Sequence, residues 1–426
     1  MKVLVIGSGG REHALVWKLS KSKKIDKIFC APGNAGIAQL AKCISLKPTD
    51  TRGLADFALR NKIALTVVGP EDPLAGGLVD EFQKRRLKVF GPDRKGARIE
   101  ASKVFAKQFM RKYHIPTAAF RVFSTAAEAI GFCRSVEFPV VIKADGLAAG
   151  KGVFVVDNLK AATHALERLM LERSLGKAGD QVIVESCLKG QEVSLMCLTD
   201  GKTVVPLLSS QDHKQAFDGD RGPNTGGMGA YSPTTLIDKE MLEQITDFIL
   251  TPTIKGLQQE GITYRGVLYI GLMITETGPK VLEFNCRFGD PETQVVLPLL
   301  KNDLLDLLLA VTGGKLASVG RLDWRPESAA CVVMASKGYP GSYHAGKRIT
   351  GLQEIDDSQT FVFHAATTLK GNLLLTAGGR VLNVVAVDRT LSQALARAYR
   401  SVHKIRFDGA FFRRDIGARV LKTARR

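Results

Sequence analysis

The residues best suited to bind a metal ion are Glu283 and Asn285, in the stretch VLEFNCRF (281–288). On a β-strand, side chains two residues apart point to the same face, so this carboxylate and this amide oxygen would lie side by side. Oxygen ligands of this kind suit Mg²⁺, whereas burying two polar side chains without a partner would be costly. A half-exposed strand with both side chains in water is the alternative. Arg287, which follows on the chain, could place a bidentate guanidinium on a phosphoryl or carboxylate group.

A glycine-rich loop, KADGLAAGKGV (143–153), is similar to a phosphate-binding P-loop but does not match it. A P-loop has four residues between its two glycines, and a Ser or Thr after its lysine binds Mg²⁺ through the hydroxyl. Here only three residues separate Gly146 from Gly150, and Gly152 follows Lys151. If this loop binds phosphates, other residues must therefore hold the metal.

Two more glycine-containing turns follow predicted strands near the amino terminus. VIGSGGREHA (5–14) would place backbone amides and a helix N-terminus around Gly9, an arrangement that binds anions. The dinucleotide-binding fingerprint needs a third glycine where this sequence has Glu12, which disfavours a nicotinamide-dependent dehydrogenase. The turn would then receive a phosphate or a sugar, or need its glycines for geometry alone.

The second turn, VGPEDPLAGG (68–77), contains Glu71. This residue would lie at the same sheet edge, either facing a substrate or exposed to solvent.

A polar segment, SSQDHKQAFDGDRGPNTGGMGAYSP (209–233), contains Asp212 and Lys214 among five glycines. We expect residues 218–231 to form a long irregular loop, and loops of that length in compact domains are usually functional or mobile. Backbone amides of such a loop can approach an anion closely, and a surface loop is the alternative. His213 has no partner at metal-ligand spacing, so a hydrogen-bonded or surface role is expected for it.

The sequence pattern predicts a multidomain scaffold that combines α/β and α+β units. Between residues 2 and 91, short apolar strands alternate with helical stretches, which predicts βαβ crossovers and a parallel sheet. Further along, helices are expected at 159–173 and 239–260, and Asp200-Gly201 predicts a tight hairpin. The expected domains are an α/β unit over residues 1–101, a larger α+β unit over 102–325 and a small α+β unit over 326–426.

Composition narrows the class of protein further. The seven cysteines are odd in number, scattered and never in a C-x-x-C, which argues against disulfides and a zinc site and makes the cytoplasm the default compartment. The net charge of +18 would attract phosphate-rich ligands, but it is dispersed, and 7% aromatic residues argue against a nucleic-acid face. No membrane span is expected, because the apolar stretch 297–311 is broken by charged residues and its spacing predicts an amphipathic helix.

Several motifs, in order along the chain, resemble those of the phosphoribosylamine–glycine ligases, a purine-biosynthesis family of the ATP-grasp superfamily. Besides the 143–153 loop, the resemblance is carried by GSGGREHA (7–14), DHKQAFDGDRGPNTGGMGAYSP (212–233) and LEFNCRFGDPETQ (282–294). It runs from residue 1 to about residue 420. It implies an ATP-grasp fold in the middle unit, with a lid over about 122–190, a Rossmann-like amino-terminal domain and a small carboxyl-terminal α+β domain.

The resemblance also implies a reaction. Glycine's carboxylate would attack the γ-phosphate of ATP to give glycyl phosphate, and the amine of 5-phosphoribosylamine would then displace phosphate. The partners are therefore the small molecules ATP, glycine and 5-phosphoribosylamine, with Mg²⁺ or Mn²⁺ as the metal. Neither nucleic acid nor a membrane is expected as a partner, and a monomer is the default state. Catalysis would consist of positioning and charge neutralisation.

Roles follow from the resemblance residue by residue. Glu283 and Asn285 would bind the metal, and Arg287 would be catalytic by neutralising the transferring phosphoryl group. Two lysines would reach the ATP phosphates, loop glycines would cover them, a hinge would line the adenine and a carboxylate would bind the ribose. These ATP-binding residues are Lys103, Lys143, Gly146, Gly150, Gly152, Glu185, Ser186, Leu188 and Glu192. The residues expected to bind glycine and phosphoribosylamine are Gly9, Glu71, Asp212, Lys214, Thr225 and Gly226.

One rival function stays open at this point. Another ATP-grasp carboxylate–amine ligase, or a carboxylase with a different acceptor, would need the same lysines and metal ligands. An assay of ADP release with different acceptors distinguishes the two.

Overall fold

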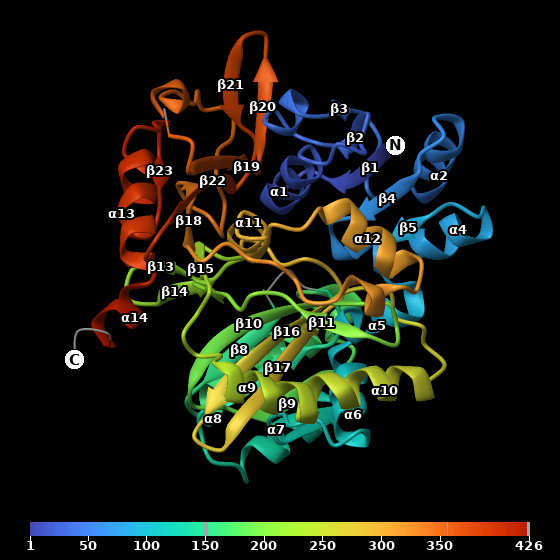
Figure 1. Ribbon diagram of the computed structural model, residues 1–426. Helices are drawn as coiled ribbons and strands as arrows, with labels where there is room; N and C mark the ends of the chain where they lie inside the picture. The colour runs from blue at the N-terminus through green and yellow to red at the C-terminus, as the bar shows by residue number, and fades with distance from the viewer. Residues whose placement is uncertain (148–151, 356, 424–426) are drawn as a thin grey trace.

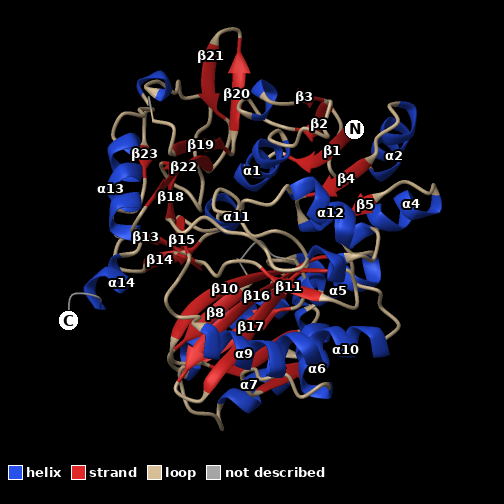
Figure 2. Ribbon diagram, viewed as in Figure 1, coloured by secondary structure: helices blue, strands red, loops and turns tan. Residues whose placement is uncertain are grey.

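The computed structural model describes residues 1–147, 152–355 and 357–423, and its elements form several separate sheets (Figure 1). In the view of Figure 1, the blue amino-terminal sheet and the red carboxyl-terminal elements lie side by side above two antiparallel sheets. Figure 2 shows that helices cover the outer faces of these lower sheets. We find no helix in the described part of the chain with the length and apolar character of a membrane span.

The amino-terminal sheet is parallel, as the alternating pattern predicts. Val3 to Ile6 are fully buried because helices cover both faces of such a sheet. In spatial order its strands are β3 (Lys42–Cys43), β2 (Lys27–Pro32), β1 (Lys2–Gly7), β4 (Leu65–Val68) and β5 (Val89–Phe90). Its helices are α1 (Gly10–Leu19), α2 (Thr51–Arg60), α3 (Glu71–Ala75), α4 (Leu78–Lys84) and α5 (Arg94–Ala101).

The next sheet has four antiparallel strands and carries the 143–153 loop at one end. In spatial order its strands are β6 (Phe120–Phe123), β9 (Val182–Ser186), β7 (Val140–Ala144) and β8 (Val153–Val156). Its helices are α6 (Lys103–Lys112), α7 (Ala126–Cys133) and α8 (Leu159–Leu166). The helix expected over 159–173 thus ends its α-helical part at Leu166 and continues as a π-helical turn from Glu167 to Leu171.

A second antiparallel sheet carries the Glu283–Asn285 stretch on its edge strand. In spatial order it comprises β11 (Val204–Pro206), β10 (Gln191–Thr199), β16 (Gly266–Thr275) and β17 (Gly278–Asn285). The predicted hairpin at Asp200-Gly201 is confirmed, since β10 and β11 pair there and Gly201 has a φ of +90°, which favours glycine. The expected helix 239–260 is also confirmed, as α9 (Lys239–Ile245), a π-helical turn (Thr246–Leu250) and α10 (Thr251–Gln259).

The carboxyl-terminal sheet takes two strands from the middle of the sequence. In spatial order it contains β12 (Gln211–Asp212), β15 (Gly229–Ser232), β18 (Ser328–Ser336), β22 (Arg380–Asp388) and β19 (Thr360–His364), with β23 (Ala410–Phe411) also paired to β18. The hairpin β20 (Thr367–Lys370) and β21 (Leu373–Thr376) projects from it, and α13 (Leu391–Val402) and α14 (Ala418–Thr423) follow. The segment with Asp212 is therefore fixed to this sheet.

Two expectations about local structure were wrong. Residues 218–231 do not form an irregular loop: they complete the hairpin of β13 (Gln215–Phe217) and β14 (Arg221–Asn224) and then enter β15. Gly222 makes this possible, because its φ is +82° and a Cβ there would lie 2.5 Å from the Phe217 ring.

The apolar stretch 297–311 is helical only from Leu304, where α12 (Leu304–Thr312) begins with Asp303 as its N-cap. The short helix α11 (Glu292–Val296) ends before the stretch begins. Asp303 accepts a hydrogen bond from the backbone N–H of Leu305, and this cap fixes where the helix starts.

The amino- and carboxyl-terminal sheets meet through aromatic residues of α1 and β19. Trp17 and Phe361 pack edge to face at 4.8 Å between ring centres, and the backbone N–H of His364 donates to Nδ1 of His13 at 2.8 Å. Both histidine rings are buried. Burial and the neighbouring His364 lower the pKa of His13 to about 3, and burial lowers the pKa of His364 to about 4.

These two histidines predict an acid-sensitive stability. Between pH 6.5 and about pH 4 the unfolded chain binds a proton at each ring that the folded protein does not bind, so stability falls as pH falls. Each ring lowers the free energy of unfolding by up to about 1.4 kcal/mol for each pH unit of acidification in this range. His13→Asn keeps an acceptor for the His364 N–H but cannot titrate. Urea unfolding across this pH range should give a shallower slope for the variant, and equal slopes would contradict the assignment.

Candidate active site

The two predicted phosphate-binding lysines lie where the sheet of β6, β9, β7 and β8 approaches β17. Lys143, at the end of β7, forms an ion pair with Glu185 and donates to the backbone carbonyl of Leu282 at 3.3 Å. Lys103 is the first residue of α6, and its ammonium donates to the carbonyl of Gly146 at 2.8 Å. Burial lowers the pKa of Lys103, although Glu283 opposes this. Both ammonium groups are thus held at the base of the glycine-rich loop.

The ends of that loop are described and its centre is not. Gly146 has a φ of +111°, a conformation suited to glycine, and the carbonyl of Gly152 accepts the N–H of Ala144 at 2.9 Å. Gly150, together with Lys151, lies outside the described residues. Asp145 fastens the near end of the loop to α6, since its carboxylate accepts the N–H of Val104 at 3.0 Å.

The predicted adenine hinge lies at the end of β9. Glu185 is buried and pairs with Lys107 as well as Lys143, so its carboxylate is turned into the protein. Ser186 is exposed and Leu188 half-buried, beside the connection to β10. The N–H of Ser186 already donates to a carbonyl of its own domain at 3.0 Å. Its carbonyl and the following backbone are therefore the groups that a base could contact here.

Sequence reasoning missed Lys107. It lies one turn after Lys103 on α6, donates to the Thr117 hydroxyl at 2.7 Å, and pairs with Glu185. Burial lowers its pKa to about 8, although Glu185 opposes this. Lysines four residues apart share one helix face, so the spacing of Lys103 and Lys107 was the available signal.

A cluster of opposite charges surrounds Glu283 on β17. Lys214 forms an ion pair with Glu192 and lies 3.6 Å from Glu283. Burial raises the pKa of Glu283, but Lys214, Lys143 and Lys103 outweigh it and lower the pKa to about 2. Burial raises the pKa of Asp212 well above its usual range. The structure therefore brings together Lys103, Lys143, Glu192, Asp212, Lys214 and Glu283, which are far apart in the sequence.

Asn285 and Arg287 continue this cluster toward the amino-terminal domain. Arg287 donates to the Asn285 amide oxygen at 3.2 Å and pairs with Glu71 at 3.1 Å and Glu100 at 3.0 Å. Burial would lower the pKa of Arg287, but the two carboxylates raise it. Burial would raise the pKa of Glu71, but Arg287 and Arg11 lower it. Glu71 is thus engaged by two guanidinium groups, which sequence reasoning did not foresee.

The turn at Gly9 is filled by the side chain that breaks the dinucleotide fingerprint. Glu12 accepts the N–H of Gly9 at 2.6 Å and pairs with Arg11 at 2.6 Å. A Cβ on Gly69 would lie 2.1 Å from the Glu12 carboxylate, so this side chain occupies the space between the ends of β1 and β4. A pyrophosphate would compete with Glu12 for this helix N-terminus, which agrees with the argument against a dehydrogenase.

Thr225 and Gly226 hold the backbone of the site in place through hydrogen bonds. The N–H and hydroxyl of Thr225 both donate to the carbonyl of Lys214 at 2.7 Å. Gly226 donates to the Tyr339 hydroxyl at 3.1 Å, and Arg380 donates to its carbonyl at 2.5 Å. The carboxyl-terminal domain therefore covers this side of the site.

Asp290 and Arg380 were also missed, and they lie where the three parts of the chain meet. Arg380 pairs with Asp290 at 3.4 Å, and a Cβ on Gly9 would lie 3.4 Å from the Asp290 carboxylate. Burial would raise the pKa of Asp290, but Arg380 and Arg11 lower it. Asp290 belongs to the quoted stretch 282–294, but nothing local indicates its distant partner.

The oxygens of Glu283 and Asn285 fit a divalent ion that shares its ligands with phosphate and water. Glu283 is 38% exposed and ionised, and Asn285 offers an amide oxygen beside it. Among the described residues no group of three or more His, Cys, Asp or Glu side chains could hold a metal. Mg²⁺ commonly uses one or two carboxylates and completes its shell with substrate phosphates and water.

The chain matches known proteins over nearly its whole length. Three family models match it: the phosphoribosylglycinamide synthetase N domain at residues 1–100, the ATP-grasp (A) domain at 101–293 and the C domain at 329–419. It is 51% identical over 418 residues to the phosphoribosylamine–glycine ligase of Caldanaerobacter subterraneus subsp. tengcongensis, covering 98% of this chain and 100% of that protein. It is 50% identical over 424 residues to that of a Nostoc species, covering 99% and 100%.

Solved structures agree with this match. The crystal structure of phosphoribosylamine–glycine ligase from Thermotoga maritima superposes with a TM-score of 0.83 at 34% identity, covering 98% of this chain and 100% of that one. The biotin carboxylase domain of the Hydrogenobacter thermophilus 2-oxoglutarate carboxylase, in complex with MgADP, ADP and bicarbonate, superposes with a TM-score of 0.75. At 16% identity, covering 96% of this chain and 91% of that one, this second likeness concerns the fold alone.

Proposed function

The chain belongs to the phosphoribosylglycinamide synthetase family, and from that membership we propose that it ligates glycine to 5-phosphoribosylamine with ATP, in purine biosynthesis. The products are glycinamide ribonucleotide, ADP and phosphate. Full-length relatives at 51% and 50% identity that bear the name phosphoribosylamine–glycine ligase support this reaction. The distant biotin carboxylase likeness supplies no argument for a carboxylase, since it concerns the fold alone.

One observation carries the proposal at the level of chemistry. The carboxylate of Glu283 lies among the positive charges of Lys103, Lys143, Lys214 and Arg287, which together hold its pKa at about 2. Such a cluster, at the base of a glycine-rich loop, suits a triphosphate and a divalent ion. Preorganised charges of this kind stabilise the negative charge of a transferring phosphoryl group.

In the first step, glycine's carboxylate attacks the γ-phosphate of ATP and forms glycyl phosphate. Lys143 and Lys103 hold the phosphates, and Glu192, which pairs with Lys214 in the structure, binds the ribose hydroxyls. Mg²⁺ or Mn²⁺ at Glu283 and Asn285, when bound, would neutralise phosphate charge and orient the reacting oxygens. Lys107 pairs with Glu185 and so compensates the negative charge of this carboxylate, which lies next to the adenine hinge at Ser186 and Leu188.

In the second step, the amine of 5-phosphoribosylamine attacks the carbonyl of glycyl phosphate, and phosphate leaves. Arg287 neutralises the leaving phosphate, so its ion pair with Glu71 must loosen when the substrate binds. The amino-terminal domain binds the sugar at Glu71 and beside Gly9, whose own N–H already donates to Glu12, and Asp212 and Lys214 face glycine. Thr225 and Gly226 hold this side of the site through their backbone contacts.

The test is an assay of ADP release by the purified chain with ATP and Mg²⁺. We expect turnover only when glycine and 5-phosphoribosylamine are both present, and a glycinamide ribonucleotide product by mass spectrometry. Turnover with bicarbonate alone would overturn the proposal. Replacing Mg²⁺ by Mn²⁺ in the same assay distinguishes the two metals.

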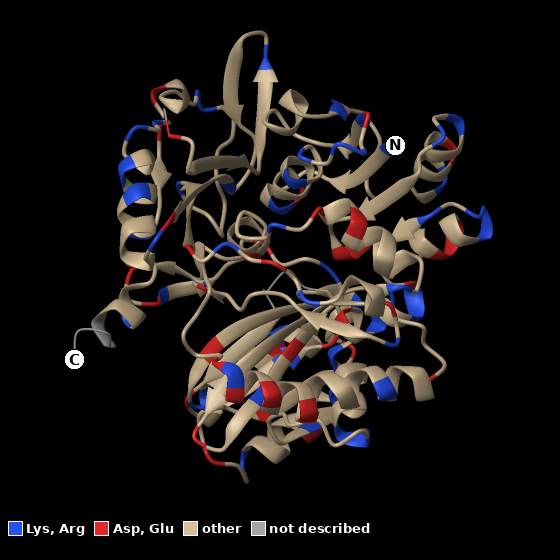
Figure 3. Ribbon diagram, in the orientation of Figure 1, with Lys and Arg blue, Asp and Glu red and all other residues tan. Residues whose placement is uncertain are grey.

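The cellular compartment, the oligomeric state and the partners of the protein are predictions. We expect it to act in the cytoplasm, which the seven free cysteine thiols support. We also expect it to be monomeric and to bind small molecules rather than nucleic acid. Figure 3 supports the last point, because lysine and arginine are spread over the elements of the chain.

A further inference from the structure

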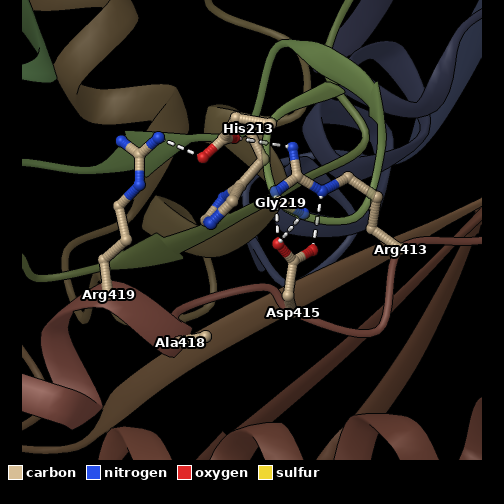
Figure 4. Close-up of a pocket in the computed structure, with 7 residues that line it drawn as sticks. His213, Gly219, Arg413, Asp415, Ala418 and Arg419 are labelled. Carbon is tan, nitrogen blue, oxygen red and sulfur yellow. Dashed lines mark hydrogen bonds and ion pairs between the residues drawn. The ribbon is translucent and has the colours of Figure 1, made fainter. Parts of the chain in front are cut away.

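In the segment 413–417, the first three residues contact the β13–β14 hairpin, which follows Lys214 directly in the sequence (Figure 4), and Gly417 contacts His213. We call this segment the carboxyl-terminal clasp. The N–H of Arg414 donates to Asp218 at 2.8 Å, and Asp415 accepts the N–H of Gly219 at 2.8 Å. The clasp therefore binds two consecutive residues in the turn of the hairpin.

Arg413 is the centre of this contact and is only 1% exposed. Its guanidinium pairs with both oxygens of Asp415 at 2.8 and 2.7 Å, and with Asp220 at 2.9 Å. It also donates to the carbonyl of Gln215 at 3.2 Å. Arg413, Asp415 and Asp220 line a cavity of about 330 Å³ together with His213 and Gly219. Figure 4 shows the ion pairs of Arg413 beside this cavity. A buried charge with this many partners holds its neighbours in one geometry, because losing any partner is costly.

The contact with Gln215 links the clasp to the candidate active site. Gln215 follows Lys214, whose ammonium lies between Glu192 and Glu283. Directly after β14, Thr225 donates to the carbonyl of Lys214 at 2.7 Å. His213, on the other side of Lys214, accepts the N–H of Gly417 at 3.2 Å. Both neighbours of Lys214 are thus hydrogen-bonded to the carboxyl-terminal segment, Gln215 through its backbone carbonyl and His213 through its imidazole ring.

We propose that Arg413 and Asp415 are positioning residues, which hold Lys214 at the distance from Glu283 that glycine binding requires. The inference rests on the proposed function, because Lys214 acts on glycine only if that reaction is the one catalysed. A purely structural clasp would keep the end of the chain folded and leave substrate affinities alone. If the clasp positions Lys214, disrupting the clasp should lower the affinity for glycine more than the affinity for ATP.

The experiment compares Arg413→Met, Arg413→Lys and a matched control, Arg397→Met. Arg397 pairs with Asp357 at 2.6 Å and Asp388 at 2.8 Å in the same domain, and within the described part of the chain it has no hydrogen bond or ion pair with the hairpin. We expect Arg413→Met to raise the KM for glycine about tenfold by misplacing Lys214, with a smaller rise in the KM for ATP because Lys214 also pairs with Glu192. Arg413→Lys should recover part of this affinity, and Arg397→Met should leave the KM for glycine unchanged.

Hydrogen exchange of the backbone amides in 213–224 gives a second readout that needs no turnover. We expect faster exchange in Arg413→Met than in the wild type and Arg397→Met. An unchanged glycine KM in folded Arg413→Met, or an equal change in Arg397→Met, overturns the inference. If Arg413→Met does not fold, Asp415→Asn takes its place with the same expected results. If the wild type shows no glycine-dependent turnover, the proposed function fails, and unchanged hydrogen exchange would separately overturn the clasp.

Discussion

Glu283→Gln should lower turnover at saturating substrates by about a hundredfold or more, as expected when a preorganised charge at a phosphoryl-transfer site is lost. The amide keeps the shape of the side chain but removes the carboxylate that Lys103, Lys143 and Lys214 surround. It also weakens one of the two expected metal ligands. Steady-state ADP release measured across a Mg²⁺ titration should therefore show a higher metal requirement together with the lower turnover.

A matched control for this substitution lies on the same hairpin. Glu276, at the exposed turn between β16 and β17, lies at the opposite end of β17 from Glu283. Glu276→Gln should leave turnover and the metal requirement unchanged. Wild-type turnover in a correctly folded Glu283→Gln protein would show that Glu283 is not a metal ligand of the reaction.

Arg287→Met should reduce both stability and activity, for different reasons. Without the guanidinium, Glu100 is left buried without its cation, and breaking a buried pair in this way costs about 3 kcal/mol. Turnover should fall by about a hundredfold, because a charge that stabilises the phosphoryl group is also lost. Urea unfolding gives the first quantity and ADP release the second.

A double variant separates the two effects. In Arg287→Met with Glu100→Gln the buried charge is removed, and the amide oxygen can still accept the N–H of Cys286, as Glu100 does at 2.7 Å. Stability should then recover in part while turnover stays low. Recovery of turnover together with stability would mean that Arg287 acts only by holding the fold.

Local patterns predicted the fold class well. The alternation of strands and helices over 2–91 predicted the parallel sheet, and Asp200-Gly201 predicted the β10–β11 hairpin. Residues 218–231 were misjudged, because glycine and polar composition favours a loop, while strand pairing depends on the partner strand, which is the neighbouring β13 for β14 and the distant β18 for β15. The same limit applies to β12 and β15, whose place in the carboxyl-terminal sheet depends on β18, about a hundred residues later (by difference of positions).

The candidate site also divides into residues that local motifs predicted and residues whose roles depend on distant partners. Motifs pointed to Lys143, Glu283 and Arg287, and the structure gathers them with Lys103 and Lys214 in one cluster. Glu100 and Arg380 gave no local signal, since their partners lie 186 and 90 residues away. The roles of Glu71 and Glu185 also depend on ion pairs with cationic side chains far away in the sequence. Residue spacing along the chain does not predict such pairs. Whether each residue contacts a substrate stays a prediction.

The pairing of β15 with β18 bears on how this protein could be divided for study. A fragment starting near residue 326 would contain β18 with the hydrogen-bonding edge that β15 normally covers left open. Open edges of this kind recruit strands from other molecules, so such a fragment should self-associate when expressed alone. Co-expression with a fragment that supplies residues 209–233 would close that edge, which makes this segment the natural shared piece of any split form.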